Sequence, residues 1–308
     1  MTPSATTLKA AADSLGSSDA VVDIAVVIPA FNERDGVGPT LNRVRTVMAS
    51  MPLTFEILVV DDGSSDGTAD QAKQQDVRVV RLPENRGYGA ALKTGIARTR
   101  SEYVLITDAD GTYPPEAIPA LMAAMQEADM AVGARAPDDP SILRRRRSAK
   151  RFLGALASYL AGRRIPDLNS GLRVMRRSVL SQFLHILPPG FSFTTTITMA
   201  MLCNGHQVAY VPIECGSRVG SSKLRAKEFS AFIMLVLRTV VLFNPLKVFL
   251  PLGAGLFLVG VAKLIYDIFL WNLSETAVMA FLAAIVVWSV GLLADMITRL
   301  QIYQRGAS

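Results

Sequence analysis

Histidine and cysteine are scarce in this sequence, which has two of each among 308 residues. His185 and His206 are too few to support a histidine metal site or a Ser–His–Asp triad. Cys203 and Cys215 do not have the spacing of a metal site, and nothing else indicates an oxidising compartment, so we expect two reduced core thiols. Any chemistry in this chain must therefore depend on carboxylates, arginines and a cation.

Two other common signals are also missing. The first 20 residues lack a basic stretch followed by a continuous apolar run, which argues against both a signal peptide and a membrane span. We expect a flexible tail over residues 1–22. The glycines of Gly87-Tyr-Gly-Ala-Ala91 resemble a phosphate-binding turn, but the G-x-G-x-x-G pattern of dinucleotide-cofactor sites is absent. A dinucleotide cofactor is therefore not expected.

Charged residues are absent from two stretches near the C-terminus, 248–262 and 276–294, and half of all residues are hydrophobic. Because a membrane span needs about 20 apolar residues, we predict a membrane-bound chain with spans at about 248–271 and 276–297. The loop Asn272–Glu275 is so short that the two spans must form a hairpin.

Basic residues flank the predicted inner ends of these spans, which places the region before the spans and both termini in the cytoplasm by the positive-inside rule. These flanking residues are Lys247, Arg299 and Arg305. Charges inside a membrane are candidates for function by default. We nevertheless expect structural roles for the three present, because Lys263 and Asp267 are four residues apart and can pair, and Asp295 is near a span end.

The region before the spans alternates apolar runs with segments of helical spacing. Strands are predicted at 23–29, 55–60, 77–82 and from 104, and a further strand at 208–213. A helix is predicted after the first strand, from the helical spacing of Val37, Leu41, Val44 and Val47, and another after the second strand, with Ser65 or Asp66 as its cap. Further helices are predicted from about Asn85 to Ile96 and at 191–201. This alternation predicts an α/β fold with a Rossmann-like, mostly parallel sheet whose ligand crevice is at one edge.

The stretch Val104–Pro115 is the most informative one, because its β-forming residues stop at Asp108 and Asp110. Ligands of open α/β sheets bind beyond the carboxyl ends of strands. Two carboxylates with small neighbours suit a hard divalent cation that takes its remaining oxygens from water and phosphates. An acidic pair alone is more often a solvated loop, but the buried strand before it and the Tyr-Pro-Pro after it favour a metal site.

Several motifs in order resemble the family 2 glycosyltransferases of the GT-A fold, and most of all the polyprenyl-phosphate sugar transferases typified by dolichyl-phosphate mannose synthase. The matching segments are PAFNE (29–33), DDGSSDGT (61–68), NRGYGAALKTGI (85–96), DADGTYPPE (108–116), VGAR (132–135), LNSGLRVMRR (168–177) and SRVGSSKLR (217–225). Together they cover nearly all of residues 23–225.

This resemblance implies the roles of individual residues. The residues expected at the nucleotide sugar are Pro29, Phe31, Glu33, Asp61, Asp62, Lys93, Asp108, Ala109, Asp110 and Arg135. Asp108 and Asp110 are expected to hold Mg²⁺ or Mn²⁺ on the diphosphate. Arg218, Ser222 and Lys223 are expected at the acceptor phosphate, and Arg135, Arg218 and Lys223 are implied as catalytic phosphate contacts together with the two metal carboxylates.

The implied reaction is inverting transfer from GDP-mannose or a UDP-hexose to a membrane polyprenyl phosphate. The resembling synthases often have Gln where this chain has Thr112, so the sugar and the nucleotide remain open. A phosphate acceptor is largely ionised near neutral pH, because its second pKa is about 6. No strong general base is then needed, and positioning and electrostatics can drive the transfer.

Two segments are expected to hold the catalytic domain against the membrane. In residues 141–166, arginines and a lysine surround an apolar stretch. Residues 229–243 are apolar except for Arg238, and we expect an interfacial helix there, with a true membrane span as the alternative. A solvated face or an RNA-binding patch is the alternative for the first segment, but lipid headgroups are favoured and no nucleic-acid partner is expected. The expected division is a tail (1–22), a catalytic domain (23–225), a juxtamembrane interfacial helix (226–246) and a hairpin with a short cytoplasmic tail (247–308).

Two other functional classes are less consistent with the sequence. A processive polysaccharide synthase would need a Q-x-x-R-W element and more spans, and a non-enzymatic scaffold would be expected to lose its acidic pair or its basic residues. A membrane glycosyltransferase that acts on a glycolipid or polysaccharide remains the alternative. Homo-oligomerisation is left open.

Overall fold

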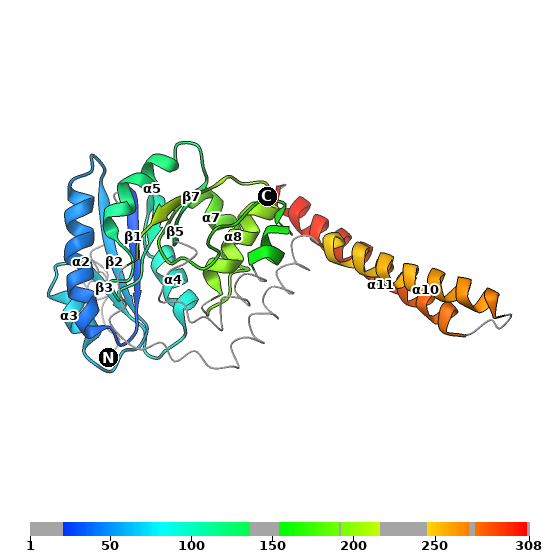
Figure 1. Cartoon of the computed structure of the whole chain (residues 1–308). Helices are drawn as coiled ribbons and strands as arrows, with labels where there is room; N and C mark the ends of the chain where they lie inside the picture. Colours follow the sequence, from blue (N-terminus) through cyan, green and yellow to red (C-terminus); the bar gives the residue numbers. More distant parts are fainter. Residues whose placement is uncertain are drawn as a thin grey trace, which may run out of the picture.

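The computed structural model describes residues 21–135, 154–159, 161–190, 192–215, 245–270 and 275–306. They form an α/β domain followed by two long helices (Figure 1). Most of the predicted tail, the arginine cluster at 144–151 and the predicted interfacial helix at 229–243 lie outside the described residues. Arg218, Ser222 and Lys223 lie outside them as well.

Seven strands form one sheet in the order β3-β2-β1-β4-β6-β5-β7. Their bounds are β1 (Val22–Ala30), β2 (Phe55–Asp61), β3 (Arg78–Arg81), β4 (Ser101–Ile106), β5 (Met130–Arg135), β6 (Arg173–Arg176) and β7 (Val208–Ile213). All neighbouring pairs are parallel except the two that involve β6. The predicted mostly parallel sheet is thus confirmed, and the reversed β6 is an addition that the sequence did not predict.

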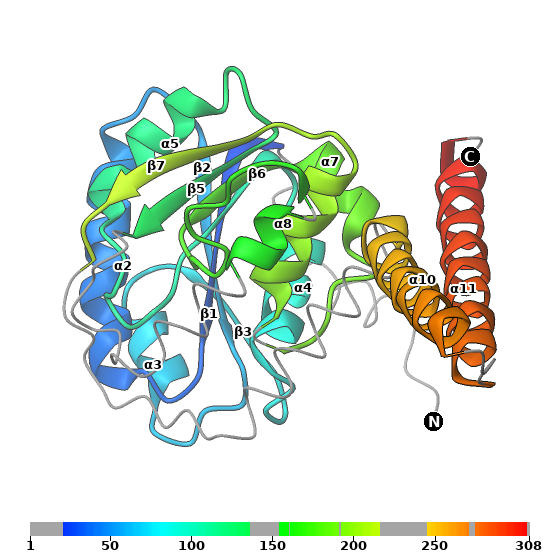
Figure 2. The ribbon, with the colours of Figure 1, turned by 45° about the vertical axis from the view of Figure 1, so that its right-hand side comes forward.

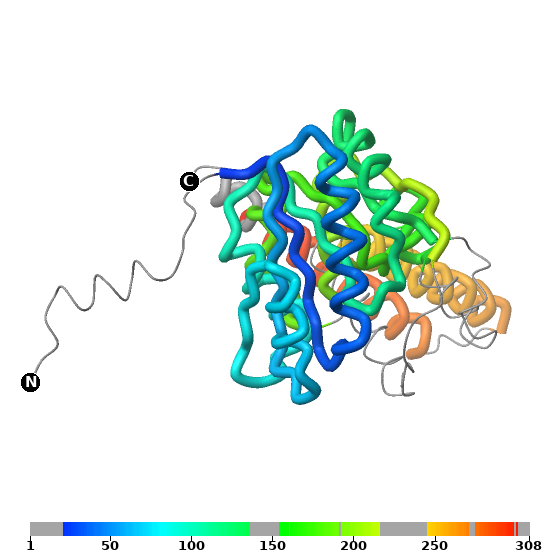
Figure 3. The backbone as a smooth tube through the Cα atoms, turned by 90° about the vertical axis from the view of Figure 1, so that its left-hand side faces the viewer, coloured from blue at the N-terminus to red at the C-terminus, as the bar shows by residue number. Residues whose placement is uncertain are grey.

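Helices cover both faces of the sheet. One face carries α2 (Arg34–Ala49), α3 (Thr68–Lys73), the 3-10 helix η1 (Pro115–Ala117) and α5 (Ile118–Ala124). The other face carries α4 (Tyr88–Ala97), α7 (Arg177–Phe183) and α8 (Phe193–Cys203). Figure 3 shows α2 lying along β1. The predicted apolar spacing of α2 is confirmed, since Val37, Leu41 and Val44 are fully buried in the core on that face.

The direction of the strands decides which loops meet. The carboxyl ends of β1, β2, β4, β5 and β7 lie at one edge of the sheet, which we call the carboxyl edge. Because β6 is antiparallel to its neighbours β4 and β5, its amino end lies at the same edge. The segment Asn169–Gly171, just before β6, therefore joins the loops that follow the parallel strands.

The two C-terminal helices, α10 (Leu246–Phe269) and α11 (Glu275–Gly306), pack side by side and project away from the sheet (Figures 1 and 2). Each is long and apolar enough to cross a membrane, and most of each apolar stretch is exposed, unlike the core helix of a soluble domain. A helix is present at the position of each predicted span, and α11 continues beyond the predicted end at 297.

Glycines on each helix receive aromatic side chains from the other. A Cβ atom on Gly253 would lie 2.3 Å from the Trp288 ring, and one on Gly291 would lie 2.5 Å from Phe249. The Trp288 indole N–H donates to the Leu250 carbonyl at 3.2 Å. The two helices of this hairpin are thus in close contact where Gly253 meets Trp288 and Gly291 meets Phe249.

Two further contacts define the hairpin. The predicted i, i+4 pair is present, because the Lys263 ammonium donates to the buried Asp267 carboxylate within α10. At the base of the hairpin, Val248 packs on a small apolar cluster that includes Leu168 and Leu202, and Lys247 Nζ donates to the Tyr159 carbonyl at 3.5 Å. The hairpin therefore rests on the part of the α/β domain that includes α8.

Candidate active site

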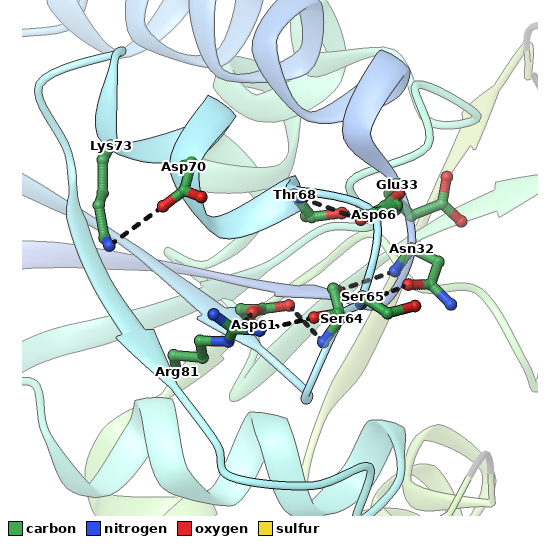
Figure 4. A network of polar contacts seen from close by, with 10 residues as sticks. All are labelled: Asn32, Glu33, Asp61, Ser64, Ser65, Asp66, Thr68, Asp70, Lys73 and Arg81. Carbon is green, nitrogen blue, oxygen red and sulfur yellow. Dashed lines mark hydrogen bonds and ion pairs between the residues drawn. The ribbon is translucent and has the colours of Figure 1, made fainter.

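The loops after β1 and β2 are bonded to each other at the carboxyl edge (Figure 4). The Asn32 amide donates to Ser64 Oγ at 2.9 Å, and Asn32 Oδ1 accepts from the Ser65 amide at 3.0 Å. The Glu33 amide donates to Thr68 Oγ1 at 2.9 Å. Asn32 has a positive φ of 53°, a conformation that asparagine tolerates better than most residues. These bonds fix the two loops as one polar platform.

Asp66 has a related role that differs from the sequence prediction. Neither Asp66 nor Ser65 is the N-cap of α3, because Gly67 takes that position with a φ of 91°. Asp66 instead accepts from the Thr68 amide at 3.0 Å and from the Arg34 amide at 3.1 Å. Burial opposes ionisation of this carboxyl group, but the bonds from Thr68 and Arg34 lower its pKa below the ordinary value.

The two carboxylates that end β2 are buried and have different partners. Asp61 accepts from the Ser64 amide at 3.1 Å, and its Oδ2 lies 3.3 Å from Arg81 Nε. Asp62 accepts from the amides of Arg86 and Gly87, both at 2.8 Å. Asp62 thus anchors the turn that leads into α4.

Asp108 lies between two tyrosines and a glycine. Tyr88 at the start of α4 donates its hydroxyl to Asp108 Oδ1 at 3.0 Å. The Gly171 amide donates to the Tyr113 hydroxyl at 2.7 Å, and a Cβ atom on Gly171 would lie 2.8 Å from both Asp108 carboxylate oxygens. Burial and then the Asp108 charge raise the pKa of Tyr88 well above its ordinary value and raise the pKa of Tyr113 to about 12. Both phenols therefore stay protonated at neutral pH.

Asp110 is buried and accepts from the Thr112 amide at 3.0 Å. The Thr112 hydroxyl is also buried and makes no hydrogen bond within the described part of the chain. The described residues contain no group of three or more His, Cys, Asp or Glu side chains that could hold a metal ion. Asp108, Asp110 and Thr112, within five residues of one another in the chain, can offer only side-chain oxygens, and oxygen ligands suit Mg²⁺ or Mn²⁺ with further oxygens from phosphate and water.

Arg135 ends β5 and is clamped by Asp167. Its Nε and Nη2 atoms donate to the two Asp167 oxygens at 2.7 and 3.0 Å, and its amide donates to the same carboxylate at 3.2 Å. Burial alone would lower the pKa of Arg135, but the bonded Asp167 raises it above its ordinary value. The guanidinium is therefore a fixed, permanently charged group at the carboxyl edge.

The other predicted site residues are spread over three elements. Pro29 is buried in β1, and Phe31 just beyond it is 43% exposed. Ala109 is buried between the two acidic residues, and its carbonyl accepts from Thr40 Oγ1 at 3.1 Å. Lys93 is half-buried on α4, where burial lowers its pKa.

Lys93 lies apart from the acidic pair. It is more than one helical turn along α4 from Tyr88, the residue that contacts Asp108. Four residues earlier on the same helical face, the Gly89 backbone packs against the segment Pro188–Gly190. The structure thus brings Asp61, Asp108, Asp110 and Arg135 to the carboxyl edge, and Lys93 lies on α4, the helix that follows β3.

Sequence reasoning missed Asp167, Tyr88, Tyr113 and Gly171 as parts of this site. Three of them stand inside motifs that were recognised, so their presence was visible but their contacts were not. Asp167 comes one residue before a recognised motif and is 32 residues from Arg135. No local spacing relates residues so far apart, and only the pairing of β6 with β4 and β5 brings them together.

Comparison with known families gives two matches. Residues 25–184 match the model of glycosyl transferase family 2, which covers the sheet from β1 to β6. Residues 244–300 match the model described as the GtrB C-terminal hairpin, which corresponds to α10 and most of α11.

Curated relatives include the undecaprenyl-phosphate 4-deoxy-4-formamido-L-arabinose transferase of Edwardsiella ictaluri, which is 36% identical over 168 residues. The enzyme with the same description from Klebsiella pneumoniae is 33% identical over 172 residues. The alignments cover 53% and 54% of this chain and 51% and 52% of the relatives. The chain thus spans about half the length of the curated relatives it matches.

Solved structures share the fold. Glucosyl-3-phosphoglycerate synthase from Mycobacterium tuberculosis superimposes with a TM-score of 0.56, at 22% identity over 78% of this chain and 85% of that one. Another structure of that enzyme contains Mn²⁺ and uridine diphosphate. Mannosyl-3-phosphoglycerate synthase from Rubrobacter xylanophilus has a TM-score of 0.56 at 23% identity, over 71% of this chain and 72% of that one.

Proposed function

The chain belongs to glycosyl transferase family 2, and from this we propose that it transfers a sugar from a nucleoside-diphosphate sugar to the phosphate of a membrane polyprenyl phosphate. One observation carries the proposal. An acidic pair at the carboxyl edge of a GT-A sheet is joined in one chain to an apolar helix pair of the kind that matches the GtrB hairpin model. The curated relatives act on undecaprenyl phosphate by name, which supports the same acceptor class.

The donor would lie across the polar platform. Pro29, Phe31, Glu33 and Asp61 would line the base and ribose, and the partly exposed Phe31 ring offers a surface for the base. Asp62 and Lys93 are proposed nearby. The buried bonds of Asp62 to the Arg86 and Gly87 amides favour an indirect role, in which Asp62 holds the turn before α4.

Asp108 and Asp110 would hold Mg²⁺ or Mn²⁺ on the donor diphosphate. When bound, such a cation neutralises charge that develops on the leaving diphosphate. Arg135 would donate to the same phosphates, because Asp167 fixes its guanidinium in place. Fixed donors of this kind stabilise a transition state without reorganising during the reaction.

The acceptor phosphate would attack the sugar from the face opposite the diphosphate and invert the anomeric centre. Its second pKa of about 6 leaves it largely ionised at neutral pH, so proton removal is not required. The protonated state of Tyr88 and Tyr113 agrees with this, since neither phenol can serve as a base near pH 7. Arg218, Ser222 and Lys223 are proposed to bind the acceptor phosphate.

The hairpin would place this reaction at the cytoplasmic face of the membrane. Lys247 at the base of α10 and the exposed Arg163 and Arg164 support that orientation, because basic residues are retained on the cytoplasmic side. A reporter fused after Ser308 should report a cytoplasmic location. A signal from the opposite side of the membrane would refute the orientation.

A donor screen with the purified protein, Mn²⁺ and a short polyprenyl phosphate tests the proposed reaction. We expect one nucleotide sugar, GDP-mannose or a UDP-hexose, to give a lipid-linked product. Equal transfer to a soluble alcohol would contradict the acceptor. Transfer to a glycolipid or polysaccharide, with none to polyprenyl phosphate, would favour the alternative function.

A further inference from the structure

Arg173, the first residue of β6, is fully buried and has only neutral hydrogen-bond acceptors within the described part of the chain. Its Nε and Nη2 atoms both donate to the Ser170 carbonyl. Its Nη1 atom donates to the Thr194 carbonyl at 3.1 Å and to Thr198 Oγ1 at 3.0 Å. Burying a guanidinium is costly when none of its direct hydrogen bonds goes to a carboxylate, even with the Asp167 charge in its surroundings, so its position needs a physical explanation.

The Ser170 carbonyl connects Arg173 to the acidic pair. Gly171 follows Ser170, and its backbone lies so close to Asp108 that a Cβ atom would be 2.8 Å from both carboxylate oxygens. The Gly171 amide also donates to Tyr113 at 2.7 Å. A shift of the Ser170 carbonyl would therefore move the backbone against which Asp108 packs.

Helix α8 supports the same turn from a second point. The Thr195 hydroxyl donates to Asn169 Oδ1, and Thr194 and Thr198 of the same helix accept from Arg173. The turn Asn169–Gly171 is thus tied to α8 by its first residue directly and by its second through Arg173. Both ties come from a rigid helix, which limits how far the turn can move.

We propose that Arg173 is a positioning residue for the acidic pair: its guanidinium pins the Ser170 carbonyl to α8 and so holds Gly171 against Asp108. This inference about Arg173 depends on the proposed function in one respect, namely that Asp108 and Asp110 hold the cation. Groups that orient metal ligands without touching the metal have large effects on its affinity.

Arg177 provides a matched control. It is half-buried and also donates only to neutral oxygens among the described residues, namely the carbonyls of Ser101 and Ile96 and the hydroxyls of Thr99 and Ser101. It follows the carboxyl end of β6, which lies at the sheet edge opposite the acidic pair. A purely structural role for Arg173 would let the two variants differ in overall stability, because Arg173 is more deeply buried, but not in Mn²⁺ affinity or in exchange confined to residues 168–172.

The test compares Arg173→Lys with Arg177→Lys in the full chain. Lysine keeps the charge but cannot donate twice to one carbonyl while reaching Thr194 and Thr198. We expect Arg173→Lys to weaken Mn²⁺ binding in the presence of pyrophosphate by roughly ten- to a hundredfold, the range found for groups that orient metal ligands. Arg177→Lys should leave it unchanged, and free Mn²⁺ can be counted by electron paramagnetic resonance.

Hydrogen exchange provides a readout that does not depend on a metal. Arg173→Lys should speed exchange of the peptide over residues 168–172, and Arg177→Lys should not. Equal exchange and equal Mn²⁺ affinity in the two variants would overturn the proposal. If the wild type bound no Mn²⁺, the metal assignment of the proposed function would fail, and exchange alone would still decide the role of Arg173.

A milder variant covers the case in which Arg173→Lys does not fold. Thr198→Val removes one acceptor of the guanidinium, nearly conserves volume and keeps Arg173 itself. We expect a severalfold loss of Mn²⁺ affinity and faster exchange of residues 168–172. Wild-type values for both measurements would then count against the proposal.

Discussion

The carboxyl edge of the sheet and the membrane hairpin both bury acidic side chains, but they satisfy them in different ways. Asp62 accepts from backbone amides that are 24 and 25 residues away along the chain. Asp267 is paired with a lysine only four residues away in the same helix. The first arrangement requires the sheet to be folded, whereas the second forms as soon as one helix forms.

Buried carboxylates therefore have different roles in the two regions. At the carboxyl edge, bonds between distant loops give polar groups fixed positions, which a reaction needs. In the hairpin, a local pair lowers the cost of placing two charges in a membrane segment without tying it to other elements. Changes at the edge should therefore affect chemistry, and changes in the hairpin should affect stability.

Asp110→Ala is expected to have the largest effect. Removing a proposed cation ligand should lower sugar transfer to polyprenyl phosphate by about a hundred- to a thousandfold, because the leaving diphosphate loses charge stabilisation. Asp70→Ala is the control, since Asp70 is an exposed carboxylate paired with Lys73 on α3. Full turnover by Asp110→Ala, or by the wild type in excess chelator, would contradict the cation site. It would also mean that changes at the carboxyl edge do not affect chemistry more than changes in the hairpin do.

Lys263→Met should have the next largest effect, and on stability alone. It removes the lysine partner of the buried Asp267, which should destabilise the hairpin by about 3 kcal/mol, as for other buried ion pairs that lose one member. The double variant Lys263→Met, Asp267→Leu should recover most of the loss. Thermal unfolding in detergent measures both. A loss of transfer rate per folded molecule would instead show that the pair serves the reaction.

Gly253→Ala should give the smallest of the three effects. The new methyl group would meet the Trp288 ring, so overpacking should cost about 1 to 3 kcal/mol in hairpin stability. Gly255→Ala is a close control, because no atom lies within 4 Å of a Cβ atom at that position. Thermal unfolding of the two variants should separate them. Equal unfolding temperatures would mean that the helices do not depend on this close approach.

The sequence predicted the elements that carry their own signal. Apolar runs located β1, β2 and β4, of which the last two end at carboxylates, and helical spacing located α2. The helices α10 and α11 were predictable because each contains a long uncharged apolar stretch, the pattern of a candidate membrane span. In each of these cases the information lies within a single segment.

The sequence could not predict what depends on pairing between distant segments. β6 is a four-residue strand that begins and ends with arginine, so neither its length nor its composition indicates a strand inside the sheet. Its reversed direction brings Asp167 to Arg135 and buries Arg173 under α8. These contacts are determined by strand order, which no local spacing encodes.

The reversal of β6 also has a consequence for how members of this family can diverge. The connection from β5 to β6 leaves the sheet and returns to it at the same edge, and the ion pair between Arg135 and Asp167 joins its two ends. A connection of another length or composition could thus replace the present one between β5 and β6, provided that the Arg135–Asp167 ion pair is kept.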